Sequence, residues 1–151
     1  MNPETTMAHT LSGFPAAATE FVSALEANRR KIAEDAGLTA TELRALFHVA
    51  QVVSITPKDL AAYLGMTTGA VTAIARSLVD ADLLTRVDHP DDRRSLYLTL
   101  SPNGHEQMKQ IHRDFNDMVA ASTSALSPKQ LEQFSTALRT VAREVRARIQ
   151  Q

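Results

Sequence analysis

Apolar residues recur at intervals of three and four along most of the chain, a spacing that places their side chains on one face of an α-helix. The runs begin after residues that can bond the free N–H groups of a helix start, or at a proline that suits the first helical position. The pattern therefore predicts helices between Pro15 and Gly37, after Thr39, from Pro57 to Gly65, from Thr67 or Thr68 to about Ala81, after Ser101-Pro102 and after Ser127-Pro128.

After the fourth of these helices the spacing of apolar residues changes to alternation, which is typical of a half-buried β-strand. Residues 84–88 and 95–100 are predicted strands, and the polar run HPDDRR between them is predicted to be a charged turn. The two strands therefore form a β-hairpin. Residues 52–55 are a further short run rich in β-branched residues, and they are predicted to form a short strand.

Residues 57–81 contain two predicted helices joined by a tight turn at Gly65–Thr67, and the hairpin follows directly. A helix-turn-helix followed by a hairpin is a winged helix, and its second helix has the right length to enter the major groove of DNA. The order predicts a fold that is mainly α with a small β-hairpin wing, and DNA binding is the leading functional hypothesis.

The exposed face of the second helix carries small and hydrogen-bonding side chains, which allow close approach to phosphates and bases. Its only cation is Arg76, and the hairpin tip adds two more that could reach a minor groove. The predicted DNA-contacting residues are Thr67, Thr68, Gly69, Thr72, Ala73, Arg76, Ser77, Arg93 and Arg94.

The segment ITPKDLAAYLGMTTGAVTAIARSLVDADLLTRVDHPDDRRSLYLTLSPNG resembles the winged-helix core of the MarR family of bacterial transcriptional regulators. Its most specific piece is the wing, where Asp92, Arg93 and Arg94 follow Asp91 and precede a strand ending in LSPNG. The resemblance implies that Asp92 and Arg94 tie the wing loop together and touch the minor groove. It also implies a homodimer with interlocking terminal helices, and a pocket for a small aromatic or anionic effector.

The chain departs from the family pattern on and just after the second helix. Family members often carry a cation where this chain has Ala73, an Asp where it has Arg76, and a Gly where it has Asp82. Contacts from the helix face therefore cannot be transferred one side chain at a time. The turn at Asp82 is still expected, because Asp tolerates the left-handed backbone conformation better than most residues other than glycine.

We expect a single domain over residues 1–151, with a winged helix-turn-helix lobe at 38–101. Dimerisation helices are expected at 11–36 and 102–150, and a frayed arm at 1–10. No basic segment followed by an apolar one opens the chain, and no apolar stretch is long enough to span a bilayer. These features predict a cytoplasmic protein with no membrane partner.

Charge and composition narrow the function further. With 16 Lys and Arg against 17 Asp and Glu, the chain cannot bind nucleic acid through overall positive charge, so a DNA-binding surface must be a local patch. The absence of Cys excludes disulfides and thiolate metal sites. An aromatic content of 5% without Trp argues against stacking on single-stranded bases.

The function expected is a sequence-specific, DNA-binding transcriptional regulator: a homodimeric repressor of a pseudo-palindromic operator, released by a small-molecule effector. His48 is the one candidate for lining the effector pocket. A winged-helix module for protein–protein assembly, with weak DNA binding, is the alternative that the few cations favour. An enzyme is disfavoured, because HEQMK has Lys109 where a zinc-binding motif needs its second His, and glycine-rich phosphate loops are absent. We therefore expect no catalytic residue, no cofactor and no metal site.

Overall fold

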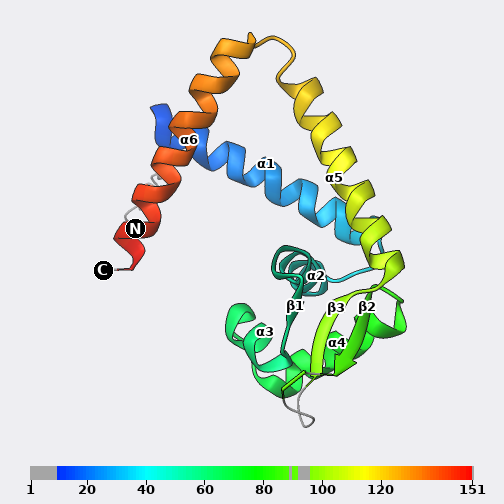
Figure 1. Ribbon diagram of the computed structural model, residues 1–151. Helices are drawn as coiled ribbons and strands as arrows, with labels where there is room; N and C mark the ends of the chain where they lie inside the picture. Colours follow the sequence, from blue (N-terminus) through cyan, green and yellow to red (C-terminus); the bar gives the residue numbers. More distant parts are fainter. Residues whose placement is uncertain (1–9, 89, 92–95, 151) are drawn as a thin grey trace, which may run out of the picture. The chain divides into compact units, whose positions relative to one another are not determined.

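The computed structural model describes residues 10–88, 90–91 and 96–150. Among them the fold is mainly helical with a small antiparallel sheet, as predicted (Figure 1). The elements in chain order are α1 (Gly13–Asp35), α2 (Ala40–Val52), β1 (Ser54–Ile55), α3 (Pro57–Leu64), α4 (Thr68–Asp80), β2 (Leu84–Asp88), β3 (Leu96–Leu100), α5 (Pro102–Ser122) and α6 (Pro128–Ile149).

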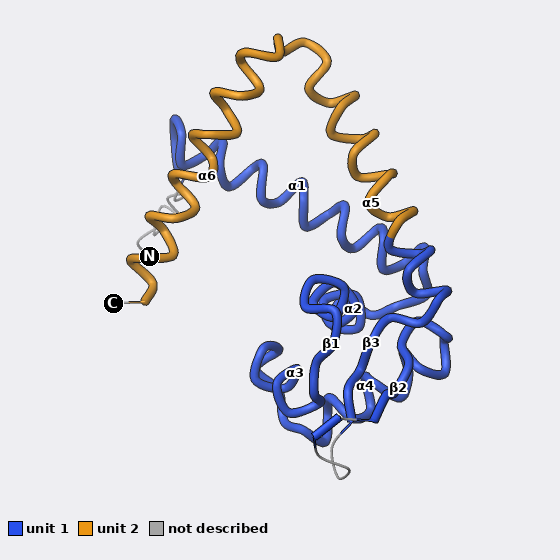
Figure 2. Tube along the Cα trace, in the orientation of Figure 1, with its two compact units in different colours: residues 1–108 blue, residues 109–151 orange. Residues whose placement is uncertain are grey.

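The chain forms two compact units, Met1–Met108 and Lys109–Gln151 (Figure 2). The first unit contains α1 to α4, the sheet and the first turns of α5. The second contains the remainder of α5 and all of α6. No helix among the described residues is long and apolar enough to cross a membrane.

Two helices begin with the reciprocal hydrogen bonds of a capping box. Thr39 donates its N–H to Glu42 Oε2 at 2.8 Å, and Glu42 donates its N–H to Thr39 Oγ1 at 3.1 Å. Ser127 and Gln130 repeat this exchange at the start of α6, over 2.8 and 3.3 Å. These bonds satisfy N–H groups that have no partner inside the helix, and they confirm the predicted helix starts.

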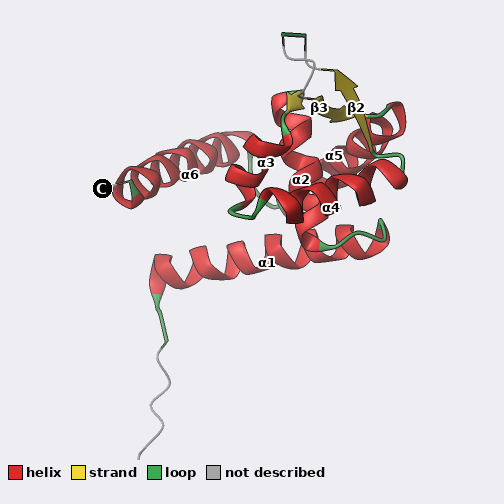
Figure 3. Cartoon of the chain, turned by 90° about the horizontal axis from the view of Figure 1, so that it is seen from below, coloured by secondary structure: helices red, strands yellow, loops and turns green. Residues whose placement is uncertain are grey.

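Among the described residues the sheet has three strands in the order β1-β3-β2, all antiparallel, and Figure 3 shows its neighbouring strands β2 and β3. The predicted hairpin is the β2–β3 pair. The predicted short strand is β1, whose Ser54 and Ile55 pair with Thr99 and Leu98. Ile55, Leu98 and Leu84 are buried, and Leu98 is fully inaccessible. One face of the sheet therefore closes the core of the first unit.

The helices α2, α3 and α4 pack against one another and supply most of that core. Burying a leucine stabilises a fold by roughly 1.5–3 kcal/mol, so a small cluster of such residues holds the three helices together. The largest fully buried side chains are Leu46, Leu60, Leu78, Leu84, Leu98, Val49, Val71 and Ser101.

Hydrogen bonds tie the end of α4 to the start of α5. Asp82 adopts a φ of 55°, the left-handed conformation expected there. Its carbonyl accepts from Ser101 Oγ at 2.5 Å and from Asn103 Nδ2 at 3.3 Å. Ser101, which is buried, also donates its N–H to the Leu83 carbonyl at 3.1 Å and accepts from the Gly104 N–H at 2.9 Å. This junction fixes the C-terminal end of α4 against the first turn of α5.

Val53, directly after α2, has φ 70° and ψ −48° and is 74% exposed. A β-branched residue at positive φ is strained. We expect Val53→Gly to raise the free energy of unfolding by about 1 kcal/mol, because the strain relieved exceeds the entropy that glycine adds to the unfolded chain. Urea denaturation measures the change. Val52→Gly, at the last residue of α2, is the control and should lower stability; a lower midpoint for Val53→Gly would contradict the strain.

The second unit presents apolar side chains that its own helices do not cover. No residue of α6 is buried, although a row of apolar residues follows one of its faces at intervals of three and four. In α5, Phe115 and Met118 are also exposed. The exposed apolar residues of α6 are Phe134, Val141, Val145 and Ile149.

Candidate nucleic-acid interface and a cavity

The turn between α3 and α4 is built by Gly65 and Thr67. Gly65 adopts φ 67° and ψ 35°, a left-handed conformation that suits glycine because it has no Cβ. Met66 donates its N–H to the Ala61 carbonyl at 3.0 Å, which closes the end of α3. Thr67 Oγ1 accepts from the Ala70 N–H at 3.3 Å and begins α4. The predicted helix-turn-helix is confirmed, with Thr67 as the cap of its second helix.

The helix α4 has one buried face and one exposed face. Val71, Ala75 and Leu78 are buried, and Ile74 is half-buried. The predicted contact residues on this segment are all exposed: Thr67, Thr68, Gly69, Thr72, Ala73, Arg76 and Ser77. The structure therefore brings these seven residues onto the accessible side of one helix and its cap.

The hydroxyl groups on this surface have different hydrogen-bonding capacity. Thr72 Oγ1 donates to the Thr68 carbonyl at 2.8 Å, so its proton is used within the helix and only its lone pairs face outward. Thr67 Oγ1 accepts from the helix and keeps its proton for an outside acceptor. With the guanidinium of Arg76, the surface offers donors suited to phosphate oxygens and to purine N7 and O6 atoms.

Ser77 differs from the other residues of this set, because it lowers the pKa of the Glu42 side chain on α2. Burial raises the pKa of Glu42, but the effects of Ser77 and of the Thr39 hydrogen bonds outweigh burial and hold the pKa below its usual range. The carboxylate is therefore a charged acceptor at neutral pH.

The predicted wing contacts Asp92, Arg93 and Arg94 lie outside the described residues. Within the described part of the wing, Arg86 is a further cation that was not among the predicted DNA-contacting residues. It pairs in register with the buried Leu98, so its side chain lies on the core-facing side of the edge strand β2, yet Arg86 is exposed. The sequence did contain a signal for Arg86, because strand alternation places this charged residue on the inner face of the strand, where an apolar residue is expected.

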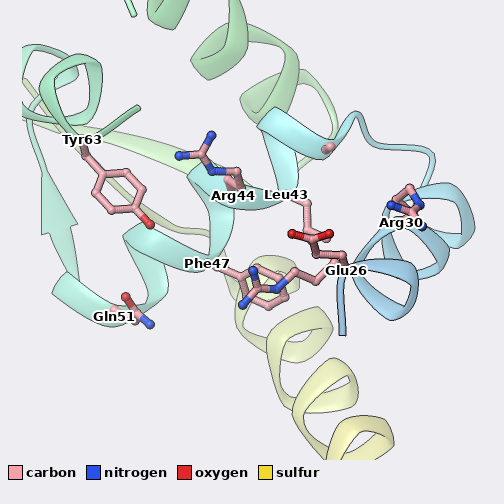
Figure 4. Close-up of a pocket in the computed structure, with 9 residues that line it drawn as sticks. Glu26, Arg30, Leu43, Arg44, Phe47, Gln51 and Tyr63 are labelled. Atoms are coloured by element: carbon pink, nitrogen blue, oxygen red, sulfur yellow. The ribbon is translucent and has the colours of Figure 1, made fainter. Parts of the chain in front are cut away.

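A cavity of about 440 Å³ lies among α1, α2 and α3 (Figure 4). In Figure 4, Tyr63 lies on one side and Glu26 and Arg30 on the other, with Arg44 and Phe47 of α2 between them. Three guanidinium groups, one carboxylate and two aromatic rings suit a planar anion that carries a ring. The lining residues are Glu26, Arg29, Arg30, Ala40, Leu43, Arg44, Phe47, Gln51 and Tyr63.

His48, the sequence-based candidate for an effector pocket, is not among the residues that line this cavity. Its ring instead stacks on Tyr63, with centroids 3.5 Å apart and planes within 2° of parallel. His48 Nδ1 is buried and has no hydrogen-bond partner among the described residues. His48 therefore contacts one of the residues that line the cavity. No cluster of three or more His, Asp or Glu residues that could hold a metal occurs in the described part of the chain.

Comparisons with known proteins agree on one family and one fold. The model of the MarR family matches residues 36–95. The transcriptional repressor MprA of Escherichia coli K12 is 29% identical over 131 residues, which cover 85% of this chain and 72% of MprA. A mutant of S. aureus MepR bound to an oligodeoxyribonucleotide superposes with a TM-score of 0.67 at 18% identity, covering 89% of this chain and 99% of MepR. NadR in complex with 4-hydroxyphenylacetate gives 0.62 at 20% identity, covering 91% and 98%.

Proposed function

Because this chain belongs to the MarR family of DNA-binding transcriptional regulators, we propose that it is a homodimeric repressor of a pseudo-palindromic operator, released by a small molecule. The helix α4 enters the major groove, and the wing that includes Arg93 and Arg94 reaches the adjacent minor groove. MprA, a repressor by name, and MepR, whose structure holds an oligodeoxyribonucleotide, support this proposal.

The observation that carries the proposal is the exposed face of α4. Its residues are small or hydrogen-bonding, while the opposite face is anchored in the core by Val71 and Leu78. A rigidly seated helix with such a surface can approach base edges closely, and phosphate contacts set its register on the duplex. One recognition helix per subunit and twofold symmetry together imply an operator with two related half-sites.

We propose that the effector binds in the cavity among α1, α2 and α3, and that it is an aromatic carboxylate. Arg29, Arg30 and Arg44 can bind a carboxylate, and Phe47 and Tyr63 can contact a ring. The ligand of NadR, 4-hydroxyphenylacetate, belongs to the same class. The helix α2 forms one wall of the cavity and also packs against α4, so a ligand that shifts α2 also shifts the recognition helix.

Selection of duplexes from a random-sequence pool by the purified protein tests the DNA-binding role. We expect enrichment of an inverted repeat whose half-sites are centred about 10 base pairs apart, on one face of the duplex. Enrichment of a single asymmetric half-site would contradict binding of a symmetric dimer to two half-sites. Failure to enrich any sequence would instead favour the alternative function, a winged-helix module for protein–protein assembly.

Arg76→Ala is expected to weaken binding to the selected duplex by about 1–3 kcal/mol and to relax preference at one position per half-site, if Arg76 contacts a base edge. If Arg76 instead supports the wing through Asp92, Asp92→Ala should have the same effect and the double variant should add nothing. Fluorescence anisotropy at several salt concentrations distinguishes these cases. Arg139→Ala on α6 removes the same charge as a control; equal affinity of Arg76→Ala and wild type would remove Arg76 from the interface.

A further inference from the structure

The rings of His48 on α2 and Tyr63 on α3 stack face to face. Their centroids are 3.5 Å apart and their planes lie within 2° of parallel. Carbon atoms in van der Waals contact are separated by about 3.5–4 Å, so at this distance one ring lies over the other with little offset. The two residues therefore form a flat, two-layered unit that joins α2 to α3.

This stack lies at the wall of the cavity among α1, α2 and α3. His48 is on the same side of α2 as Arg44, four residues before it, and Gln51, three residues after it. Arg44 and Gln51 both line the cavity, but His48 does not (Figure 4). Tyr63, which stacks on His48, does line it and is 47% exposed. One face of the Tyr63 ring is therefore covered by His48, and the opposite face is left for the cavity.

The orientation of the His48 ring is not set by a hydrogen bond at Nδ1. This atom is buried and has no partner among the residues that the structure describes. A buried polar atom without a partner is unfavourable, so other contacts of the ring must compensate for it. The stack on Tyr63 supplies such a contact, and it holds the two rings parallel.

We propose that Tyr63 is a stacking platform for the aromatic ring of the effector, and that His48 is the positioning residue that holds this platform flat. The ring of the ligand lies on the open face of Tyr63, as the third layer of the stack. Its carboxylate remains free for the guanidinium groups of the cavity. The proposal rests on the effector site proposed above, and it adds selection for a flat, unsaturated ring over a saturated ring of similar size.

The stack itself is tested by NMR of the free protein, without any ligand. Protons that lie over the face of an aromatic ring are shifted upfield by its ring current. We expect the His48 ring protons to resonate upfield of their ordinary positions, and Tyr63→Leu to return them there. Tyr97→Leu replaces the other tyrosine, which does not line the cavity, and as the matched control it should leave them shifted. Ordinary His48 shifts in the wild-type protein would overturn the proposal whatever the protein binds.

The platform is tested by titrating the full-length protein with phenylacetate and with cyclohexylacetate. The two probes carry the same carboxylate and six-membered rings of similar size, but only phenylacetate is flat and aromatic. Stacking favours an aromatic pair beyond the area that it buries, so we expect phenylacetate to bind about 2- to 10-fold more tightly than cyclohexylacetate. In Tyr63→Leu this preference should disappear, while the affinity for cyclohexylacetate is kept, because the guanidinium groups remain.

Two results of these titrations would overturn the platform. Equal affinity of the wild-type protein for both probes would show that the cavity does not select a flat ring. Loss of the preference in Phe47→Leu but not in Tyr63→Leu would place the ring of the ligand on Phe47.

The role of His48 is tested by His48→Leu, which removes the flat ring and keeps an apolar side chain in its place. We expect this variant to lose the preference for phenylacetate, and His48→Phe, which keeps a flat ring, to regain it. Both variants should bind cyclohexylacetate as the wild-type protein does, which shows that the cavity is folded and still holds a carboxylate. A wild-type preference in His48→Leu would overturn the positioning role.

Failure of the proposed effector class gives a different result from failure of the platform. If neither probe binds the wild-type protein, the aromatic-carboxylate class is contradicted, and the platform with it, even where the His48 ring protons show that the stack is formed. If both probes bind with equal affinity, the cavity binds carboxylates and only the platform is overturned.

Discussion

Replacing Gly104 with alanine is expected to lower the free energy of unfolding by about 3 kcal/mol, at the upper end of the range for overpacking substitutions. A Cβ at this position would overlap the Leu83 carbonyl oxygen and would lie 3.1 Å from the Leu83 carbonyl carbon. Atoms without a bond between them cannot approach so closely, so either α5 or the segment after α4 must move.

The junction leaves little freedom for such a movement. The Leu83 carbonyl that the new methyl group would meet already accepts from the Ser101 N–H at 3.1 Å. The neighbouring Asp82 carbonyl accepts from Ser101 Oγ and Asn103 Nδ2. Displacing α5 would therefore break hydrogen bonds of a buried serine, and an unsatisfied buried polar group is itself costly, at about 1–3 kcal/mol.

Urea denaturation followed by circular dichroism measures this effect, and Gly69→Ala is the matched control. A Cβ at Gly69 meets nothing within 4 Å, and Gly69 lies in the first turn of α4. Alanine favours helix formation over glycine by up to about 1 kcal/mol, so the same substitution should leave stability unchanged or raise it. A Gly104→Ala protein that unfolds at the wild-type urea concentration would show that the close approach is not present in solution.

Features with a local cause could be predicted from the sequence. The capping boxes at Thr39 and Ser127, the stop at Gly65 and the left-handed Asp82 depend on residues a few positions apart, and the structure confirms them. The exposed face of α4 was predicted for the same reason, because helical periodicity alone separates it from the buried face.

Features that depend on distant parts of the chain were not predicted. The short strand within residues 52–55 was predicted, but its pairing with Thr99 and Leu98 was not, because two residues are too few to show alternation. The cavity exists because α1, α2 and α3 pack together, which no local spacing encodes. The positive φ of Val53 likewise follows from joining α2 to β1, since a valine gives no local signal for it.

The second large effect is expected on the apolar face of α6. Val141 and Val145 are 39% and 49% exposed, and no residue of the helix is buried. Uncovered apolar faces of this kind mark protein interfaces, and a second copy of the chain is the partner that the proposed homodimer supplies. We therefore expect Val141→Asp/Val145→Asp to be monomeric at micromolar concentration, because dimerisation would bury unpaired carboxylates in an apolar interface.

The monomeric variant should bind the selected duplex at least about 100-fold more weakly than wild type, because two linked recognition helices gain affinity that a single one lacks. Analytical ultracentrifugation and anisotropy at fixed salt measure the two effects. Thr136→Asp/Ala147→Asp is the control: it adds the same charges on the opposite side of α6, where both residues are exposed. That control should remain dimeric and keep its affinity, since its carboxylates stay in water. Dimers of Val141→Asp/Val145→Asp would show that this face of α6 does not pair, and wild-type affinity in a proven monomer would show that one recognition helix is sufficient.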